Sequence, residues 1–476
     1  MIAPLVLAAL TATASAHRSV TTTNPQAQAS FDRGLSLLYA YNGDEAYRSF
    51  AQALTLDPRL AMAAWGEALA AGTDLNTALD AERFARAQQA AQTAGALEAY
   101  ASTEERAYID AVNARYSGTY ADRDADEAQY RVRMAALVAA YPNDDDAATL
   151  DAEALMEHLG TDRMWSSDGT QPAPDAATAI ALITRVLQRN PGHVMANHLC
   201  MHAYDYARDR TAAITCANRV VSWTFLPAQE HLAHMPAHTY LEAGMYPQAM
   251  DASERAWRLR EQWSGEKYAA HDAYTGWSAA MMLGDLNAAE AWAQRTGEAY
   301  NGSDLWATWA RFGQWSRIAD STSTSEFYAP FSRGLTDVHF GVMKDAHDML
   351  ALYGNTDADY RWILEAAIDE REGRIPNAID ALGRAVAYQK RQYGGETLPL
   401  FPAGEFLGGL YYRQGRYADA AGAFQQTLQK YPNDPRALYG LGLAQQHLGL
   451  GVSSQQTLKN FQQLWTDPTP PDLANL

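Results

Sequence analysis

Apolar residues recur every three or four positions along most of this chain, and the strict alternation typical of β-strands is scarce. Stretches rich in Gly, Pro and Asp, such as 117–127 and 160–175, interrupt the pattern and predict loops. The sequence therefore predicts an all-α protein, in which amphipathic helices are joined by turns and by a few irregular loop insertions.

A set of small and aromatic residues recurs along the chain with a fixed period. It places Gly408, Ala420 and Phe424 in one unit and begins the next unit at Gly442, 34 residues after Gly408. These are the spacings of a tetratricopeptide repeat, a pair of antiparallel helices that cannot bury its apolar face without a stacked neighbour. The same frame near the N-terminus contains Gly34, Ala46 and Phe50. We therefore predict a tetratricopeptide-repeat α-solenoid of roughly ten to twelve helical pairs with a concave groove.

The N-terminus begins with a short apolar run that is followed by small residues at Ala14 and Ala16, which fit an export cleavage site. This run is too short to span a bilayer, and no other stretch approaches a transmembrane length. We expect a signal peptide at 1–16 and a periplasmic or secreted mature protein. The remainder is divided into N-terminal helical repeats at 17–116, central repeats at 117–300 and C-terminal repeats at 301–476.

The chain has two cysteines, Cys200 and Cys216. They fall on the two arms of one predicted helical hairpin, at levels that antiparallel arms bring together. In an exported protein we expect them to form a disulfide, whereas in the cytosol they would be buried thiols.

Seven of the twelve histidines lie between His193 and His271. The repeat frame puts three of them at the second, fifth and ninth places of one unit's first helix, and the same places of the two adjacent units contain three more. Because those places face the groove in tetratricopeptide folds, the sequence predicts one histidine-rich surface. The candidate metal ligands are His198, His202, His231, His234, His238 and His271.

Imidazoles on helices packed about 8–10 Å apart can reach a shared ion. An all-imidazole donor set suits copper or zinc better than magnesium or calcium, and Met195 adds a soft donor that copper(I) accepts. We expect one or two copper ions, with zinc or iron as the alternatives. Asp205, one turn beyond His202, is expected to orient the second ring nitrogen of that histidine. Tyr274 is a candidate catalytic residue, as a substrate contact or a redox neighbour.

Pro236 interrupts this register between His234 and His238. It removes one backbone hydrogen bond, so it either kinks the helix or marks the helix start. In the second case His231 and His234 would be loop ligands.

The strings Asn197-His198-x-x-x-His202-Ala203 and His231-Leu-Ala-His234-Met-Pro-Ala-His238 resemble those of a bacterial family of tetratricopeptide-repeat proteins. The similarity extends over nearly the whole chain, from Phe31 onward. The resemblance implies the repeat fold and a shared histidine site, and it supplies no substrate.

The net charge of -19 argues against a nucleic-acid partner, because such proteins concentrate Lys and Arg. The donor set favours a metal-dependent oxidoreductase that uses copper, with a small-molecule or peptide substrate in the concave groove. One alternative is a peptide- or protein-binding repeat scaffold without catalysis, which is the usual role of such arrays. The other is a zinc-dependent hydrolase with a metal-bound water as nucleophile.

Overall fold

The computed structural model describes residues 12–263, 269–300, 304–323, 326–356, 358–392 and 398–471. In this part of the chain the regular secondary structure is helical, with three short 3-10 turns and three isolated β-bridges. The predicted all-α fold is confirmed. None of the described helices is long and apolar enough to cross a membrane.

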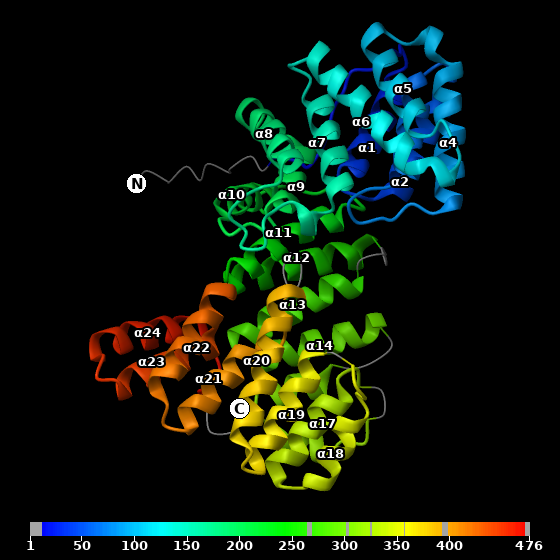
Figure 1. The fold of residues 1–476 in the computed structure, drawn as a ribbon. Helices are drawn as coiled ribbons and strands as arrows, with labels where there is room; N and C mark the ends of the chain where they lie inside the picture. The colour runs from blue at the N-terminus through cyan, green and yellow to red at the C-terminus, as the bar shows by residue number, and fades with distance from the viewer. Residues whose placement is uncertain are drawn as a thin grey trace, which may run out of the picture. The chain divides into compact units, whose positions relative to one another are not determined.

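The chain divides into two compact units (Figure 1). The first unit comprises Met1–Thr239 and Arg258–Gly265, and the second comprises Tyr240–Trp257 and Glu266–Leu476. The boundary falls inside the range 117–300, for which the sequence predicts a single set of central repeats.

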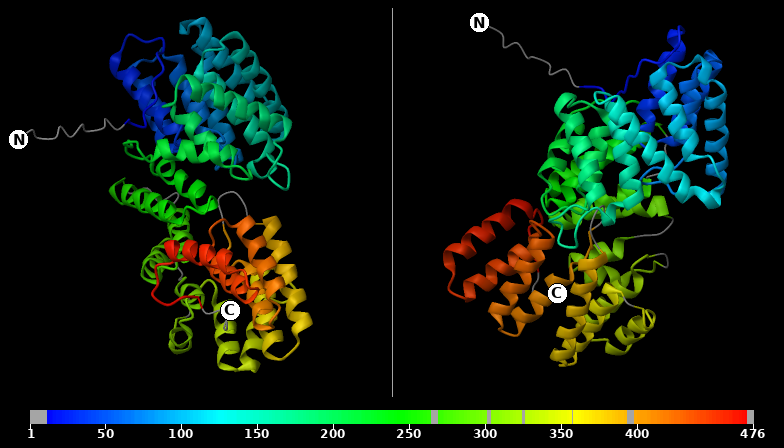
Figure 2. Two further views of the ribbon diagram at one scale, coloured as in Figure 1. Left: turned by 90° about the vertical axis from the view of Figure 1, so that its left-hand side faces the viewer. Right: turned by 45° about the horizontal axis from the view of Figure 1, so that its top comes forward.

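Successive helices of the first unit pack as antiparallel neighbours (Figures 1 and 2). Its helices are α1 (Pro25–Leu38), α2 (Gly43–Leu56), α3 (Ala61–Ala71), α4 (Ala81–Ala96), α5 (Thr103–Arg115), α6 (Arg123–Ala140), α7 (Asp145–Leu159), α8 (Pro174–Arg189), α9 (Val194–Ala203) and α10 (Thr211–Val220). The 3-10 turns are η1 (Glu98–Tyr100), η2 (Tyr120–Asp122) and η3 (Thr161–Arg163). Helices α11 (Glu230–Glu242) and α12 (Tyr246–Trp263) span the boundary.

The second unit continues the same pattern of helical pairs. Its helices are α13 (Ala269–Leu283), α14 (Leu286–Tyr300), α15 (Leu305–Arg311), α16 (Trp315–Asp320), α17 (Ala329–Phe340), α18 (Met343–Ala351), α19 (Asp359–Arg371), α20 (Ile375–Gln392), α21 (Ala403–Arg413), α22 (Tyr417–Lys430), α23 (Pro435–His447) and α24 (Gly451–Leu464).

The packing inside the repeats follows the small-and-aromatic pattern of the sequence. Phe50 is fully buried, and a Cβ added at Gly34 would lie 2.7 Å from its ring. Phe424 is equally buried, and a Cβ at Gly408 would lie 2.6 Å from its ring. Glycine at these places therefore lets the aromatic ring fill the space between neighbouring helices, as the repeat pattern predicts.

The structure corrects one predicted loop and decides between the two alternatives for Pro236. The predicted loop at 117–127 is wrong in its second half, because α6 already begins at Arg123. Acidic residues in its first turn favour a helix start, since they complement the helix dipole. Pro236 lies inside the continuous helix α11, so the histidines on either side of it are all helical.

Candidate metal centre

Three histidines of the first unit converge from two helices. His198 and His202 lie one turn apart on α9, and His231 lies in the first turn of α11. Their exposed fractions are 0%, 1% and 2%. One ring nitrogen of each lies within 4.8 Å of a ring nitrogen of the other two. We call these three residues the histidine triad.

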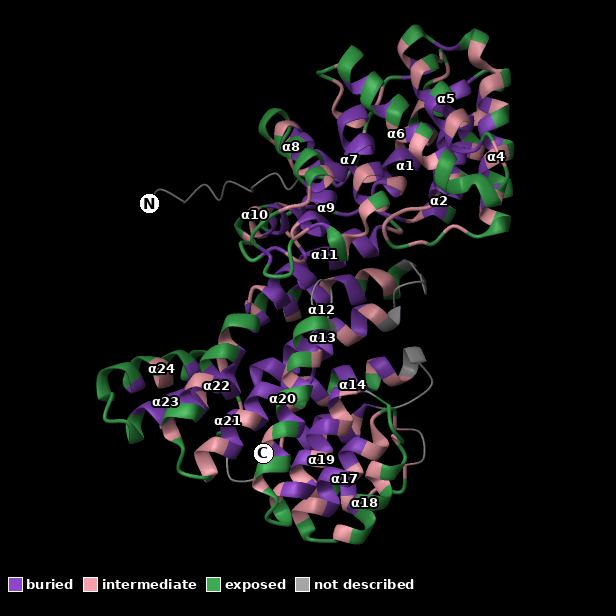
Figure 3. Cartoon of the chain, viewed as in Figure 1, coloured by how far each residue is buried: buried purple, intermediate pink, exposed green. Residues whose placement is uncertain are grey.

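The helix that contributes two of these ligands is buried on every side. All ten residues of α9 are buried, and Figure 3 shows α9 and α11 as largely buried elements. A helix that is apolar all round belongs in a core. Imidazoles inside such a core need specific partners, because an unmatched buried polar group destabilises the fold.

The partners of His198 define which of its nitrogens faces the triad. Its Nδ1 donates a hydrogen bond of 2.8 Å to the backbone carbonyl of Tyr39, which leaves the lone pair on Nε2. That Nε2 atom is buried and has no hydrogen-bond partner among the described residues. Burial, followed by the charge of His202, holds the pKa of His198 well below its usual value. His198 is therefore a neutral imidazole with an available lone pair, the form that binds metals.

The other two rings are oriented by polar side chains. Nδ1 of His202 lies 3.3 Å from Oδ2 of Asp205, the carboxylate that the sequence predicts as its partner. Nε2 of His231 lies 3.2 Å from the side-chain nitrogen of Asn76, which can only donate, so the lone pair is on Nε2 and a metal ion bound there would replace this hydrogen bond. The contact of Asp205 with Nδ1 is of the kind that fixes the orientation and tautomer of a ligating histidine.

Tyr41 forms one wall of the triad. Its ring centroid lies 4.3 Å from that of His198, 6.0 Å from that of His202 and 5.8 Å from that of His231. The side chain is 2% exposed, and its hydroxyl lies beside the carboxyl group of Glu153.

The backbone of Tyr41 is left-handed, with a φ of 57°. It stands seven residues after Gly34, at the turn between α1 and α2. The same place after Gly408 is Gly415 (φ 71°), and after Gly442 it is Gly449 (φ 73°). Left-handed backbone costs an L-residue with a side chain about 1–2 kcal/mol, which glycine avoids. The strained backbone of Tyr41 thus places an aromatic ring against the triad. Backbone strain of this kind is common at functional sites.

An acidic side chain, Glu153, also lies close to Tyr41. Tyr41, Asp74, Arg115 and Glu153 line a small cavity of about 20 Å³. Burial raises the pKa of Glu153 to about 7, and the positive charge of Arg115 opposes that rise. Burial also holds the pKa of Tyr41 well above its usual value, with a further rise from the charge of Glu153. A carboxyl that titrates near neutral pH is able to give or take a proton there.

The turn before α11 is held by the N-terminal segment. The side-chain nitrogen of Gln229 donates to the backbone carbonyls of Ala14 (2.8 Å) and Ser36 (2.9 Å). Ala228, which has a φ of 71°, accepts a 3.0 Å hydrogen bond from Asn42. These contacts place His231 relative to α1, and they include residues of the predicted signal peptide. Cleavage after Ala16 would remove the contact of Ala14.

Cys200 and Cys216 form a disulfide with a Cα–Cα distance of 6.4 Å. The predicted pairing is therefore confirmed. The bond links α10 to the middle of α9, between His198 and His202.

The other three predicted ligands are not members of the triad. His234 and His238 follow on α11, and their Nε2 atoms lie 2.8 Å apart, a hydrogen bond in which one ring donates and the other accepts. His271 and Tyr274 are on α13 in the second unit, where the Tyr274 ring packs at 5.8 Å from that of Trp277. Their roles as ligand and as catalytic residue stay predictions.

Sequence reasoning missed Tyr41, Asn76 and Glu153. Only Tyr41 leaves a signal in the sequence, because the repeat frame that begins at Gly34 calls for a glycine at position 41. Asn76 and Glu153 lie on a loop and on α7, and only the folded chain brings them to this place.

No family model matches this chain, and no curated protein matches it either. Among solved structures, the human IFIT1 dimer with m7Gppp-AAAA is 11% identical with a TM-score of 0.35, covering 91% of this chain and 90% of IFIT1. Yeast Tom70 is 10% identical with a TM-score of 0.28 over 94% of this chain and 93% of Tom70. The TPR domain of P58(IPK) is 15% identical with a TM-score of 0.23 over 89% and 98%. At such scores the likeness supports no argument, and the fold assignment rests on the helices and repeats of this chain.

Proposed function

We propose that the first unit binds a transition-metal ion through His198, His202 and His231. The observation on which this rests is the convergence of three buried ring nitrogens within 4.8 Å of one another. Metal–nitrogen bonds of about 2.0–2.1 Å place tetrahedral ligands about 3.4 Å apart, so no pair of ring nitrogens needs to close by more than about 1.4 Å. The lone pair of His198 on Nε2 fits this role, because that atom is buried without a protein partner.

Copper is the ion that we favour for this site. The three ligands are all imidazoles, and the group contains no carboxylate, which disfavours magnesium and calcium. Three neutral ligands leave coordination positions open, as catalytic metal sites require. A bound copper ion would supply one-electron chemistry, so we propose a copper-dependent oxidoreductase. Zinc or iron in the same site is the alternative, and zinc would favour hydrolysis.

The chain's own residues would serve this chemistry in defined ways. Tyr39 and Asp205 hold the rings of His198 and His202 through Nδ1. The Tyr41 ring covers one side of the triad and excludes water there. Glu153 would accept or release protons near neutral pH. The sequence also predicts a larger site of six histidines, which includes His271 and a second ion. This larger site stays a prediction.

The test is elemental analysis of the full chain after incubation with copper, zinc or iron and removal of unbound metal. We expect at least one equivalent of copper in the wild-type protein and its loss in His198→Ala. His347→Ala is the matched control, because His347 is exposed and pairs with Glu372 in the second unit. Circular dichroism verifies that each variant keeps its helices.

Each outcome of this experiment separates the candidates. Copper retention with optical bands that change on reduction and on return of oxygen supports the oxidoreductase. Preferential retention of zinc would replace it with the hydrolase. Wild-type protein that stays metal-free with all three ions would leave a peptide- or protein-binding repeat scaffold as the function.

A further inference from the structure

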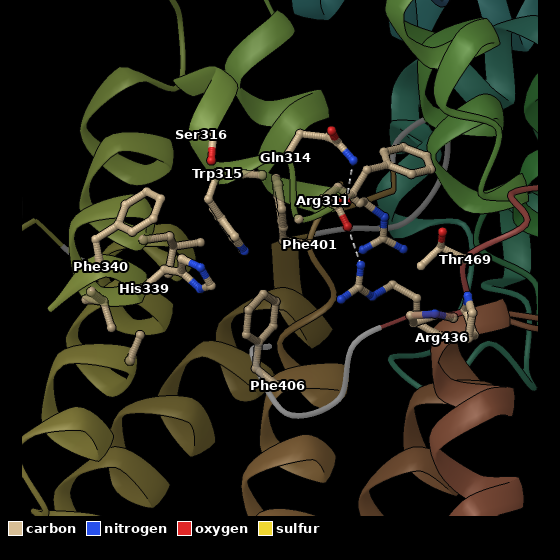
Figure 4. A pocket seen from close by; sticks show the side chains of 18 of the residues that line it. Arg311, Gln314, Trp315, Ser316, His339, Phe340, Phe401, Phe406, Arg436 and Thr469 are labelled. Carbon is tan, nitrogen blue, oxygen red and sulfur yellow. Dashed lines mark hydrogen bonds between the residues drawn. The ribbon is translucent and has the colours of Figure 1, made fainter. Parts of the chain in front are cut away.

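A cleft of about 670 Å³ opens in the second unit, well away in sequence from the histidine triad (Figure 4). It is lined by residues of α15, α16, α17, α19, α21 and α23 and by the segment 465–471. This volume falls within the range of small-molecule binding sites. The segment 465–471 bounds the cleft on one side, through hydrogen bonds from Thr466 and Asp467 to the backbone of Leu283 and Gly284.

One side of the cleft is aromatic. Trp315 stacks on His339 with ring centroids 5.4 Å apart and an angle of 26°. Phe340 beside them is 50% exposed, which is unusual for a large apolar side chain. Figure 4 shows these rings on one side of the cleft, with Phe401 and Phe406 between them and the opposite wall. Flat apolar surfaces of this kind suit a planar ligand.

The opposite wall is cationic. Figure 4 shows Arg311 and Arg436 there, and both guanidinium groups pair with the single buried carboxylate of Glu405. Arg311 makes two contacts of 3.0 Å, and Arg436 makes one of 3.2 Å. Burial and the charge of Glu405 hold the pKa of the neighbouring Asp434 well above its usual value, which favours its neutral form. This cluster therefore contains two arginines, the carboxylate of Glu405 and the carboxyl group of Asp434, which caps α23 by accepting from the backbone of Arg436 and Ala437.

A further cation stands at the rim. Arg371, the last residue of α19, is exposed and makes no ion pair with a described residue, and a Cβ added at Gly341 would lie 3.4 Å from its Nη2. Of the two carboxylates that line the cleft, Glu370 is engaged by Arg413 at 2.7 Å and 2.6 Å. Asp467 accepts a 2.7 Å hydrogen bond from the backbone of Thr469. Arg371 therefore offers an anionic ligand a cation at the rim, although the whole chain has a net charge of -19.

We propose that this cleft binds a small aromatic carboxylate, whose ring lies against Trp315 and whose carboxylate pairs with Arg436. Arginine presents a planar fork of donors that matches a carboxylate. The bounded cleft has the size of a small molecule and does not require an extended peptide. This site is independent of the metal proposed for the first unit.

The test is calorimetric titration of the full chain with naphthoate, with the uncharged naphthamide as the ligand control. We expect one naphthoate per chain and no more than weak binding of naphthamide. Arg436→Gln, Arg371→Gln and Trp315→Leu should each weaken naphthoate about tenfold or more, the loss of one charge-assisted or stacking contact. Arg416→Gln is the matched control, because Arg416 is exposed, pairs with Asp419 and lies outside the cleft.

Arg436 also donates to the backbone carbonyl of Arg311. If its variant fails to fold, Arg371→Gln and Trp315→Leu still decide the question. Absence of naphthoate binding, equal binding of naphthamide, or unchanged affinity in both of these variants would overturn the proposal. Binding of a proline-rich peptide in place of naphthoate would also overturn it and make the cleft a peptide site. Copper loading of the first unit should leave the naphthoate affinity unchanged, so this test does not depend on the metal.

Discussion

Replacing Tyr41 by Phe or by Gly separates the two contributions of this residue. Tyr41→Phe removes a buried hydroxyl that lies beside the carboxyl group of Glu153, so we expect the stability of the metal-free protein to change by no more than about 1 kcal/mol. Tyr41→Gly removes a ring of the size that buries about 150–250 Å², a loss of about 3–5 kcal/mol for aromatic truncations in cores. Relief of the left-handed backbone returns about 1–2 kcal/mol of that, which leaves a net loss of about 2–4 kcal/mol.

Urea unfolding measured at fixed pH checks these values, and copper affinity is measured on the same variants. Because the ring and not the hydroxyl covers the triad, Tyr41→Phe should keep the affinity and Tyr41→Gly should lower it. Tyr116→Phe is the control, since Tyr116 also has a buried hydroxyl but packs edge-on against Phe84, with ring centroids 5.6 Å apart. A loss of stability in Tyr41→Phe as large as that in Tyr41→Gly would show that the hydroxyl and not the ring stabilises this wall, and that this account of the wall is wrong.

Three further perturbations test other parts of the first unit. The raised pKa of Glu153 means that the folded chain keeps a proton that the unfolded chain releases, so stability should fall as pH rises from about 4.5 to about 7. Glu153→Gln should therefore raise the melting temperature at pH 8 and leave it unchanged at pH 4. Replacing both Cys200 and Cys216 by Ser should cost about 3 kcal/mol in urea unfolding, and an equal stability of the oxidised and reduced wild-type protein would contradict this. A chain that starts at residue 17 should be about 1–3 kcal/mol less stable than one that starts at residue 12, because Gln229 loses its contact with Ala14; identical melting curves would show that this contact is dispensable.

The parts of this fold that the sequence predicts are those encoded by short spacings. Gly408 and Phe424 belong to one helical hairpin, so the repeat period is enough to predict their contact. The same holds for Cys200 with Cys216 and for His202 with Asp205. Helix type and hairpin register are local properties, and the apolar period reports them directly.

The parts that the sequence does not predict depend on rotation and on distant contacts. The frame puts His231, His234 and His238 on one helix face, but which of them joins the pair on α9 depends on the rotation of α11, and in the structure it is His231. Asn76 approaches His231 across 155 residues of sequence, and no spacing rule connects them. The start of α6 at Arg123 was missed for another reason, because its acidic first turn resembles a polar loop in composition.

The hydrogen bond from His198 to the carbonyl of Tyr39 joins residues 159 positions apart. In a solenoid whose repeats contact only their neighbours, assembly can proceed in chain order. Here the turn after α1 lacks its hydrogen bond until α9 has been synthesised. Until then Tyr41 also lacks the histidine rings that pack against it in its left-handed conformation. We therefore expect the first hairpin of a nascent chain to remain loose during synthesis and to close late, after roughly 200 residues have left the ribosome. The contact between α9 and the turn after α1 then completes the first unit. We therefore expect truncation of either α1 or α9 to destabilise the other helix as well.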